Sequence, residues 1–579
     1  MIQNLICRFY ANCRIIKHSH IQYSQTSQFH HRNKDVDFRD TKIAFQAKSN
    51  FELFRGYVVF KLCSSKFLVK HNKRIMDVTK SIIGEKLFSF IMKHTVYGHF
   101  VAGETQDEIR TYVNKSRKFH VKSILDYSAE EDISDDKAKE RLKESYETVI
   151  RESTMSPSIE EEKIYRPNLK FADRSDNVIS ARTYFYESEA KCDRNMGIFL
   201  KCIDSVSDST KNEGFAAIKL TALGRPQFLL QISDFLLQLQ KLFDLLSPRT
   251  SIPESLRRFD INEFQTRLDD LGIEISYDEK IKWFTLLDVS GDGNVDLLDW
   301  SQLKNLENDY ASIFRIKDKK TGKMQQLGST LTDEGVEELR NMIQRIDKIA
   351  QHALDKGVRI MIDAEQTYFQ PAIRRLAMEM MRKFNKNSTI IFNTYQCYLK
   401  DAKAQLTQDL EMAKIENFYF GAKFVRGAYI DQERKRALDL GYPDPINDSY
   451  EDTTKMYHGC LEHVLSEINK TEKGKISIML ATHNEKTVQF ALDKMAEFDI
   501  RPQDKLICFG QLLGMCDQIS YALGHNGYSV YKYVPYGPVN EVLPYLSRRL
   551  AENHSIMENL SRELSLTKAE IKRRIFNKS

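Results

Sequence analysis

Seven short apolar runs after residue 213 constrain the fold more than any other feature of the chain. Each run ends in polar residues, and from the second run onward amphipathic segments of helical length, such as 370–384 and 485–498, separate most of them. Strands that are apolar on both faces and alternate with helices are typical of a covered parallel sheet, either a closed barrel or an open doubly wound sheet. The runs are 215–220, 358–362, 389–394, 418–425, 476–481, 505–509 and 528–534.

A closed (βα)8 barrel needs eight strands, and the apolar runs account for seven of them. We expect the eighth strand to be too short for apolar runs to reveal. The chain has 579 residues, of which 41% are hydrophobic, and this composition excludes disorder of the whole chain.

The formal net charge of +5 belongs to the N-terminal segment. Residues 1–34 contain no acidic residue, and the basic and acidic residues of the rest of the chain balance, so no nucleic-acid partner is expected. An acid-free segment without a long apolar core resembles a mitochondrial transit peptide. The basic residues of this segment are Arg8, Arg14, Lys17, Arg32 and Lys34.

The region between this leader and the first apolar run is predicted to be helical and then charged. Residues 51–128 place apolar and basic side chains at helical spacing, and residues 129–163 form a charged linker almost free of aromatic residues. Charged residues interrupt the apolar stretch 82–102, which excludes a membrane-spanning helix but leaves peripheral membrane contact open. The nine cysteines form no CxxC pair and are expected to be reduced, mostly buried thiols.

A twelve-residue loop within the long gap between the first two runs fits the EF-hand pattern. Residues 288–299 place oxygen ligands at the alternating positions and Gly293 at the sharp turn. Position 12 is an aspartate where glutamate is usual, so weak Ca²⁺ or Mg²⁺ binding and an empty structural loop both stay open. The candidate metal ligands are Asp288, Ser290, Asp292, Asn294, Asp296 and Asp299.

Polar side chains follow the apolar runs, at the edge where a parallel barrel places its chemistry. Cations outnumber carboxylates among them, which favours an anionic ligand such as a diphosphate together with a small carboxylate. Neither a Walker loop nor a GxGxxG turn is present, and His483 has no second metal ligand at suitable spacing. Lys219 alone could form a Schiff base, but no neighbour in sequence indicates the depressed pKa that this route needs. The strand-end residues are Lys219, Asp363, Glu365, Tyr395, Gln396, Lys423, Arg426, Tyr429, His483, Asn484, Gln511 and Tyr533.

The stretch 528–553 adds two fixed cations to this edge. It predicts a strand, a Pro/Gly turn and a helix, and one stripe of the helix carries Tyr545, Arg548, Arg549 and Glu552. Leu543, Leu546 and Leu550 lie on another face and can pack inward. Because guanidinium groups bind carboxylates bidentately, an amino-acid carboxylate is the expected ligand.

Several of these segments together resemble the mitochondrial proline dehydrogenase family. They occur in the order of that family and cover most of residues 212–555. The segments are GFAAIKLTALGRP (214–226), MIDAEQTYFQPAI (361–373), IIFNTYQCYLKDA (390–402), KFVRGAYIDQER (423–434), ATHN (481–484), FGQLLGM (509–515) and YKYVPYGPVNEVLPYLSRRLAEN (531–553).

The resemblance implies a fold, a reaction and a location. The fold would be a distorted (βα)8 TIM barrel that binds FAD, with an EF-hand-like insertion as in the animal branch. The reaction would be oxidation of L-proline to 1-pyrroline-5-carboxylate, with hydride transfer from C5 to the flavin N5 and electrons passed to ubiquinone. The protein would lie in mitochondria, on the matrix side of the inner membrane, in peripheral contact with that membrane.

The resemblance also implies residue roles. The proline carboxylate would be bound by Lys219, Arg548 and Arg549, with Asp363 holding these cations in place. Tyr533, Tyr545 and Leu512 would wall the proline ring against the flavin. Lys423 stands where the bacterial enzymes have arginine, which keeps the charge but loses the planar fork. The implied FAD-binding residues are Asp363, Ala364, Gln396, Lys423, Arg426, Tyr429, His483, Asn484, Gln511 and Glu552.

Two alternatives remain at this point. Hydroxyproline dehydrogenase belongs to the same family, but the phenol of Tyr533 would occupy the space for a 4-hydroxyl group. A non-enzymatic, calcium-responsive barrel is disfavoured by the intact set of strand-end residues. The predicted domains are a transit peptide (1–34), a helical arm with a charged linker (35–211), the first barrel strand (212–224), a helical insertion (225–350), the rest of the FAD-binding barrel (351–555) and a helical tail (556–579).

Overall fold

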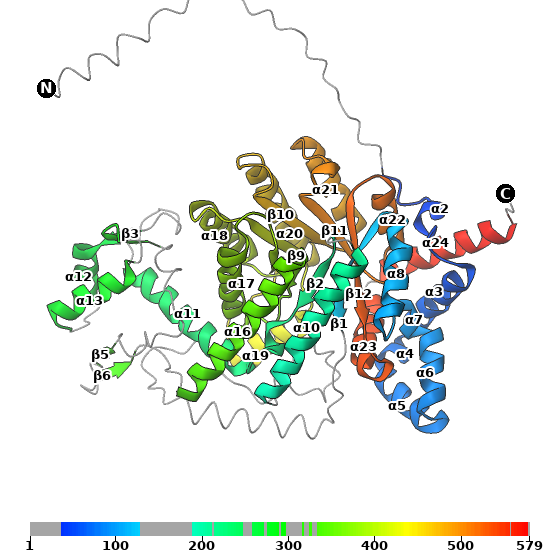
Figure 1. The fold of residues 1–579 in the computed structure, drawn as a ribbon, viewed down its shortest axis with the longest axis horizontal. Helices are drawn as coiled ribbons and strands as arrows, with labels where there is room; N and C mark the ends of the chain where they lie inside the picture. The colour runs from blue at the N-terminus through cyan, green and yellow to red at the C-terminus, as the bar shows by residue number, and fades with distance from the viewer. Residues whose placement is uncertain are drawn as a thin grey trace, which may run out of the picture. The chain divides into compact units, whose positions relative to one another are not determined.

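Eight parallel strands form a closed barrel in the computed structural model (Figure 1). The strand order around the barrel is β1-β12-β11-β10-β9-β8-β7-β2, so the open doubly wound alternative is excluded and the predicted (βα)8 barrel is confirmed. The model describes residues 36–127, 188–210, 213–246, 258–270, 275–288, 291–296, 315–317, 324–326, 333–555 and 557–576. The strands are β1 (Val121–Tyr127), β2 (Phe215–Ile218), β7 (Arg359–Ile362), β8 (Ile391–Gln396), β9 (Phe420–Val425), β10 (Ile476–Ala481), β11 (Ile507–Leu512) and β12 (Ser529–Tyr536).

The strand that the apolar pattern missed is β1, and its position corrects two predictions. It pairs with β12 from Val121↔Val530 to Tyr127↔Tyr536, and with β2 at Ile124↔Phe215. Residues 121–127 therefore belong to the barrel and not to the helical arm, and β2 is the second barrel strand. The strand is seven residues long, so shortness did not hide it. The strand was missed because its polar residues Lys122, Ser123 and Asp126 interrupt the apolar run.

Helices cover the outside of the barrel. Helix α17 has the predicted bounds, and Asn484 caps α21 by accepting a hydrogen bond from the N–H of Thr487 at 2.8 Å. Helix α16 packs against α10, α17 and β7, so the barrel resumes at residue 333, earlier than the predicted 351. The covering helices are α10 (Glu189–Thr210), α16 (Asp333–Asp355), α17 (Gln370–Phe384), α18 (Ala402–Ile415), α19 (Ile430–Leu440), α20 (Tyr450–Ile468), α21 (Glu485–Glu497) and α22 (Asp517–His525). Helix α23 (Val539–Ser555), which follows β12, packs instead against the helices of the N-terminal arm.

The amino end of the barrel is closed by Arg359. Its guanidinium carbon lies 3.9 Å from the centroid of the Phe215 ring, and its Nη2 donates to the Tyr531 hydroxyl at 2.7 Å. Buried side chains from seven of the eight strands fill the interior, so the barrel has a packed core and not a pore. Binding and chemistry are therefore left to the carboxyl end, where the predicted site residues lie.

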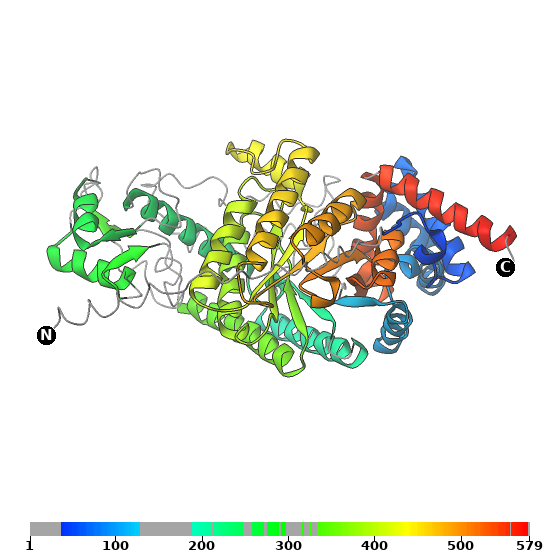
Figure 2. The same ribbon diagram turned by 90° about the horizontal axis from the view of Figure 1, so that it is seen from above.

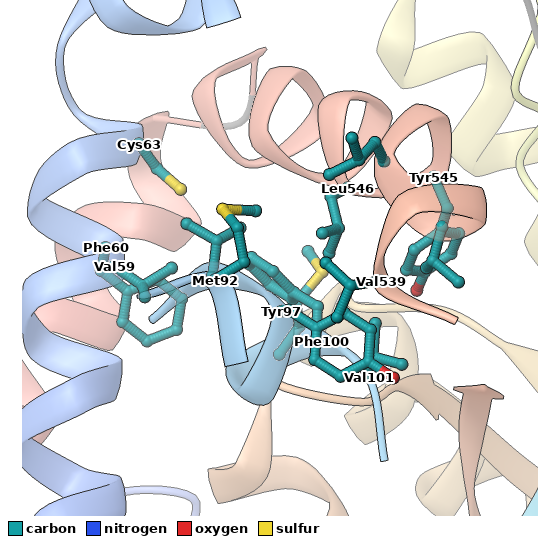
Figure 3. Packing of buried hydrophobic residues seen from close by; sticks show 14 of the residues in the cluster. Val59, Phe60, Cys63, Met92, Tyr97, Phe100, Val101, Val539, Tyr545 and Leu546 are labelled. Atoms are coloured by element: carbon teal, nitrogen blue, oxygen red, sulfur yellow. The ribbon is translucent and has the colours of Figure 1, made fainter. Parts of the chain in front are cut away.

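The N-terminal arm consists of short helices that pack on the C-terminal helices. Figure 1 and Figure 2 both show the first helices beside the last ones, and α3 packs against α23 and α24 (Met557–Phe576). Figure 3 shows the core of this contact, in which Phe60, Met92 and Phe100 of the arm meet Val539 and Leu546 of α23. The arm helices are α2 (Thr41–Ala44), α3 (Asn50–Cys63), α4 (Lys66–Lys70), α5 (Asn72–Ile83), α6 (Glu85–His94), α7 (Val96–Phe100) and α8 (Gln106–Arg117).

The region between β2 and α16 begins with helix α11 (Pro226–Leu246), which packs against α17. Helices α12 (Ile261–Asp270) and α13 (Tyr277–Leu287) follow, and the short strands β3 (Arg258–Asp260) and β4 (Asn294–Asp296) pair antiparallel. A second pair is formed by β5 (Arg315–Lys317) and β6 (Met324–Gln326). In the described part of the chain, no helix is both long and apolar enough to cross a membrane. All seven described cysteines are buried and free, as expected for reduced thiols.

Candidate active site at the carboxyl end of the barrel

Asp363 is the centre of a buried charge cluster at the mouth of the barrel. It follows β7, and its Oδ1 accepts a hydrogen bond from Lys423 Nζ at 2.7 Å. Its Oδ2 accepts from the Tyr533 hydroxyl at 3.2 Å and lies 3.9 Å from Lys219 Nζ. Strands β2, β7, β9 and β12 thus contribute one residue each, which confirms that the strand ends meet.

The charge state of Asp363 is set by these neighbours. Burial raises the pKa of the carboxyl group, but the charges of Lys423 and Lys219 and the hydrogen bonds from Lys423 and Tyr533 outweigh it, so the pKa lies below its ordinary value. Asp363 is therefore an anion held between two cations. An anion so placed fixes the positions of both ammonium groups beside the barrel mouth.

Glu365 lies beside this cluster in a different state. Its side chain is fully buried, and its Oε2 accepts from the Thr221 hydroxyl at 2.8 Å. Burial raises the pKa of Glu365, and the opposing effects of Lys219 and Thr221 do not cancel it. Thr221 was missed by the sequence analysis because it lies in a 3-10 turn two residues beyond Lys219, outside any apolar run.

The segment 363–365 is held by side chains predicted to bind the cofactor. Gln396 Nε2 donates to the carbonyl of Glu365 at 2.9 Å, and the Tyr429 hydroxyl donates to the carbonyl of Ala364 at 3.4 Å. Both side chains are buried. Gln396, Tyr429 and Ala364 therefore lie together at the carboxyl end of β7.

Arg426 organises a second part of the mouth, above β9 and β10. Its Nη1 donates to the Thr454 hydroxyl at 3.0 Å and its Nη2 to the Thr487 hydroxyl at 3.1 Å, which joins the first turns of α20 and α21. Its guanidinium also lies 4.5 Å from the centroid of the Tyr450 ring. Asn484 Nδ2 donates to the Tyr450 hydroxyl at 2.7 Å. The positive ends of two helix dipoles and a guanidinium thus converge at this point.

His483 and Gln511 connect the ends of β10 and β11. His483 Nε2 accepts from the N–H of Leu512 at 3.0 Å, so in the neutral ring the proton is on Nδ1. Gln511 Nε2 donates to the carbonyl of Thr482 at 3.3 Å, and its Oε1 accepts from Ser520 at 2.9 Å. These bonds position Leu512, whose side chain packs against the core between the arm and α23.

Helix α23 follows the predicted stripe pattern only in part, because Tyr545 is buried in the same core as Leu543 and Leu546. Leu543 and Leu546 are buried in the core with the arm, and the guanidinium of Arg549 lies 5.1 Å from the centroid of the buried Tyr545 ring. Burial raises the pKa of Tyr429 well above its ordinary value, Glu365 and Asp363 raise it further, and the charge of Arg548 opposes this rise. Arg548 is thus electrostatically coupled to the barrel mouth.

Two details of the α23 prediction are left open. Glu552 lies in α23, but its side chain lies outside the described part of the structure. The expected contact of Asp363 with Arg548 and Arg549 remains a prediction, since the recorded partners of Asp363 are Lys219, Lys423 and Tyr533.

The EF-hand-like loop is only partly described. Asp288 accepts backbone hydrogen bonds from Gly291 at 2.8 Å, Asp292 at 3.2 Å and Gly293 at 2.9 Å, and both glycines have positive φ, as the sharp turn requires. Asp292 accepts from the N–H of Asn294 at 2.8 Å. Ser290, Asp299 and the side chain of Asp296 lie outside the described residues. Within the described residues, no group of three or more His, Cys, Asp or Glu side chains is arranged to hold a metal ion.

The fold and the mouth define a class of protein. A closed parallel barrel with buried cations, a buried carboxylate and helix N-termini at its carboxyl end is the architecture of a (βα)8 enzyme that acts on an anionic small molecule. The family model described as "Proline dehydrogenase" matches residues 109–562. The chain therefore belongs to the proline dehydrogenase family, and it is an oxidoreductase.

Curated relatives agree over nearly the whole chain. It is 45% identical to "Proline dehydrogenase 1, mitochondrial" of Caenorhabditis elegans, over 93% of this chain and 89% of the relative. It is 46% identical to the human protein of the same name, over 93% of this chain and 90% of the relative. Identity to "Hydroxyproline dehydrogenase" of Xenopus laevis is lower, 32% over 92% of this chain and 89% of the relative.

Proposed function

We propose that this chain oxidises L-proline to 1-pyrroline-5-carboxylate, with FAD as the hydride acceptor and ubiquinone as the final electron acceptor. The proposal is supported by the family and by relatives that are named proline dehydrogenase. The observation that carries it is the cluster of Lys219, Asp363 and Tyr533, which places a fixed cation beside a fixed aromatic ring. The relatives are named mitochondrial, which supports a mitochondrial location. A position on the matrix side of the inner membrane, in peripheral contact with it, is part of the same proposal.

Substrate binding follows from the charges at the mouth. A proline carboxylate would pair with Lys219, Arg548 and Arg549, because two or three cations around one carboxylate fix its orientation. Asp363 keeps the Lys219 ammonium in place at 3.9 Å. The Tyr533 ring, on β12, is held by its hydrogen bond to the same carboxylate. The ring of proline would then lie against Tyr533, with Leu512 and Tyr545 completing the wall.

The donors at the mouth fit FAD. Arg426 and the first turns of α20 and α21 suit a diphosphate, which is bound well by a guanidinium and by helix N-termini. The Nε of Arg426 is buried without a hydrogen-bond partner within the described structure. The rest of the mouth is surrounded by Lys423, Gln396, His483, Asn484 and Gln511. The assignment of Glu552 to FAD binding rests on the resemblance alone. When bound, FAD would supply the two-electron oxidation.

The chain itself contributes orientation and exclusion of water. The cations fix the carboxylate so that C5 of the substrate faces the cofactor, and the amine of proline must be neutral for hydride transfer. Asp363 and Lys423 are buried, which strengthens the charge interactions that hold this geometry.

Flavin spectroscopy tests the reaction. The purified chain should be yellow, and its flavin absorbance should bleach on addition of L-proline without oxygen. A folded preparation that binds no flavin after reconstitution would contradict the proposal. Faster turnover of 4-hydroxyproline than of proline would instead favour hydroxyproline dehydrogenase. It would also contradict the expectation that the Tyr533 phenol occupies the space for a 4-hydroxyl group.

The role of the α23 arginines is tested by Arg549→Met. This change should raise the KM for proline at least about tenfold while flavin stays bound, because it removes one cation from the carboxylate site. An unchanged KM would remove Arg549 from substrate binding.

A Ca²⁺ site at residues 288–299 is a separate proposal that rests on the ligand spacing alone. Isothermal titration calorimetry with Ca²⁺ tests it. Absence of heat at millimolar ion would end it.

A further inference from the structure

Helices α3 to α6 expose an unusual amount of apolar surface. Half of the large hydrophobic side chains that are recorded as exposed in the described structure lie between residues 51 and 91. Ile82 is 77% exposed, Phe67 66% and Phe54 60%. Single exposed apolar residues are ordinary, but a concentration in one segment marks an interaction surface. We call this set the arm patch: Phe51, Phe54, Leu62, Phe67, Val78, Ile82, Leu87, Phe90 and Ile91.

The arm patch is arranged in stripes. On α6, Leu87, Phe90 and Ile91 stand at i, i+3 and i+4 and face outward, while Phe88 and Met92 are buried in the core against α23. Helix α6 is therefore apolar on two faces, and only one of them is needed for the fold. Figure 1 shows α3 and α6 in the same group of helices beside α23.

Ring contacts join the stripes of different helices. The His94 ring lies 4.3 Å from the Phe90 ring and 6.4 Å from the Phe51 ring, centroid to centroid, which links α6 to α3. On α5, Val78 and Ile82 are one turn apart and both exposed. These ring contacts connect the exposed side chains of α3 and α6, and α5 packs against α6.

The charges around the arm patch are mostly positive. The exposed acidic residues on α3 to α6 are Asp77 and Glu85, and Glu85 lies 3.9 Å from the ammonium of Lys80. The exposed basic residues on the same helices are more numerous. They are Lys61, Lys66, Lys70, Arg74 and Lys86.

We propose that the arm patch docks onto a lipid bilayer that contains anionic lipids. Apolar side chains that are interleaved with lysines are the composition of interfacial helices, because the rings enter the acyl boundary while the ammonium groups reach the headgroups. A second copy of the chain suits this surface less well. A two-fold contact would place the same basic residues against each other.

This inference names a surface for the membrane contact proposed above, and its test needs no turnover. The full chain is mixed with vesicles of phosphatidylcholine alone or of phosphatidylcholine with phosphatidylglycerol, and bound protein is measured after sedimentation. We expect binding to the anionic vesicles and much weaker binding to the neutral ones. Failure of vesicle binding would overturn the surface and leave the proposed oxidation untouched.

Two variants locate the binding. Leu87→Ser/Phe90→Ser/Ile91→Ser should lower the partition coefficient at least about tenfold, because three apolar side chains no longer leave water. The matched control is Ile415→Ser/Leu438→Ser, which removes side chains that are 66% and 83% exposed on α18 and α19 and should bind as the parent does. Equal binding of both variants would overturn the assignment.

A charge variant and two further readouts complete the test. Lys66→Glu/Lys70→Glu/Lys86→Glu should lose binding to anionic vesicles, since it reverses the sign of the rim. All variants should keep the parental melting temperature and the parental oxidation of proline with a soluble electron acceptor. A triple serine variant that changes from dimer to monomer but still binds vesicles would assign the patch to a second copy and overturn the proposal.

Discussion

Two buried aspartates in this molecule each sit between two lysines, yet their surroundings differ. Asp363 lies at the barrel mouth, 2.7 Å from Lys423 and 3.9 Å from Lys219. Asp517 lies at the start of α22 outside the barrel, 2.6 Å from Lys48 and 2.8 Å from Lys532. For both, burial raises the pKa of the carboxyl group, and the two cations together lower it below its ordinary value.

The two clusters differ in the parts of the fold that their other hydrogen bonds connect. Lys532 is fully buried and also donates to the carbonyls of Leu512 and Met515. Glu563 of α24 accepts from the N–H of Cys516, whose φ is 52°. The Asp517 cluster therefore joins the arm, β12, α22 and α24, while the Asp363 cluster joins strands at the carboxyl end of the barrel. The comparison shows that the same charge arrangement occurs both between packed helices and at the strand ends of the barrel.

The largest expected effect is on stability. Asp517→Asn leaves the buried Lys532 and the partly buried Lys48 without their anion and should lower the free energy of unfolding by about 3 to 5 kcal/mol. Urea denaturation measures this. The control is Asp448→Asn, whose side chain is 82% exposed and pairs with Lys400 at 3.0 Å, and which should change stability by less than about 0.5 kcal/mol. Equal effects of the two variants would contradict a structural role for the Asp517 cluster.

Asp363→Asn should act on turnover more than on stability. With its anion removed, Lys219 is no longer fixed beside the substrate, and kcat/KM for proline should fall about 100-fold, or about 2.7 kcal/mol. Steady-state kinetics on folded protein measure it, with the exposed Asp431→Asn as the control. A variant that unfolds as readily as Asp517→Asn but keeps parental kcat/KM would erase the distinction between the clusters.

The Asp517 cluster should also give stability a pH dependence. Burial raises the pKa of Glu563 to about 7, and the charge of Asp517 adds to the rise. The stability linked to the protonated form is present below the unfolded pKa of about 4.5 and is lost as the pH rises through about 7, with a slope of at most about 1.4 kcal/mol per pH unit. Glu563→Gln should flatten this slope in urea titrations between those values. A slope that persists in the variant would assign it to another group.

The smallest expected effect comes from Tyr533→Phe. The variant loses a 3.2 Å hydrogen bond to Asp363 but keeps the ring, so kcat/KM for proline should fall about fivefold, or about 1 kcal/mol. The pKa of Asp363 should rise, because one of the interactions that lower it is gone. A pH profile of kcat/KM tests both statements. A loss as large as that of Asp363→Asn would mean that the hydroxyl has a further role.

Local patterns in the sequence predicted much of the barrel. Contacts between residues far apart in the chain could not be predicted from such patterns. Apolar runs and helical spacing found seven strands, and helix α17 has its predicted bounds, because those segments are buried on regular faces. Strand β1 was missed because its polar residues interrupt the run. The Asp517 cluster was missed because Lys48, Lys532 and Glu563 lie far apart in the chain. A signal for it did exist: Lys532 lies within an otherwise apolar strand, and a buried cation requires an anion.

For the site, residue type and strand order indicated which side chains gather, but not how they pair. The strand-end rule brought Lys219, Asp363, Lys423 and Tyr533 together, as the structure confirms. That Asp363 binds Lys423 more closely than Lys219 depends on side-chain conformations, which no spacing pattern encodes.

The seam between β1 and β12 sets a limit on when the barrel can form. Val121 pairs with Val530, roughly 400 residues later, and a ribosome needs about 20 to 80 s to make that length. During this interval β1 lacks its principal neighbour, and its backbone donors and acceptors are available to other chains. The barrel therefore cannot close until its last strand has been made.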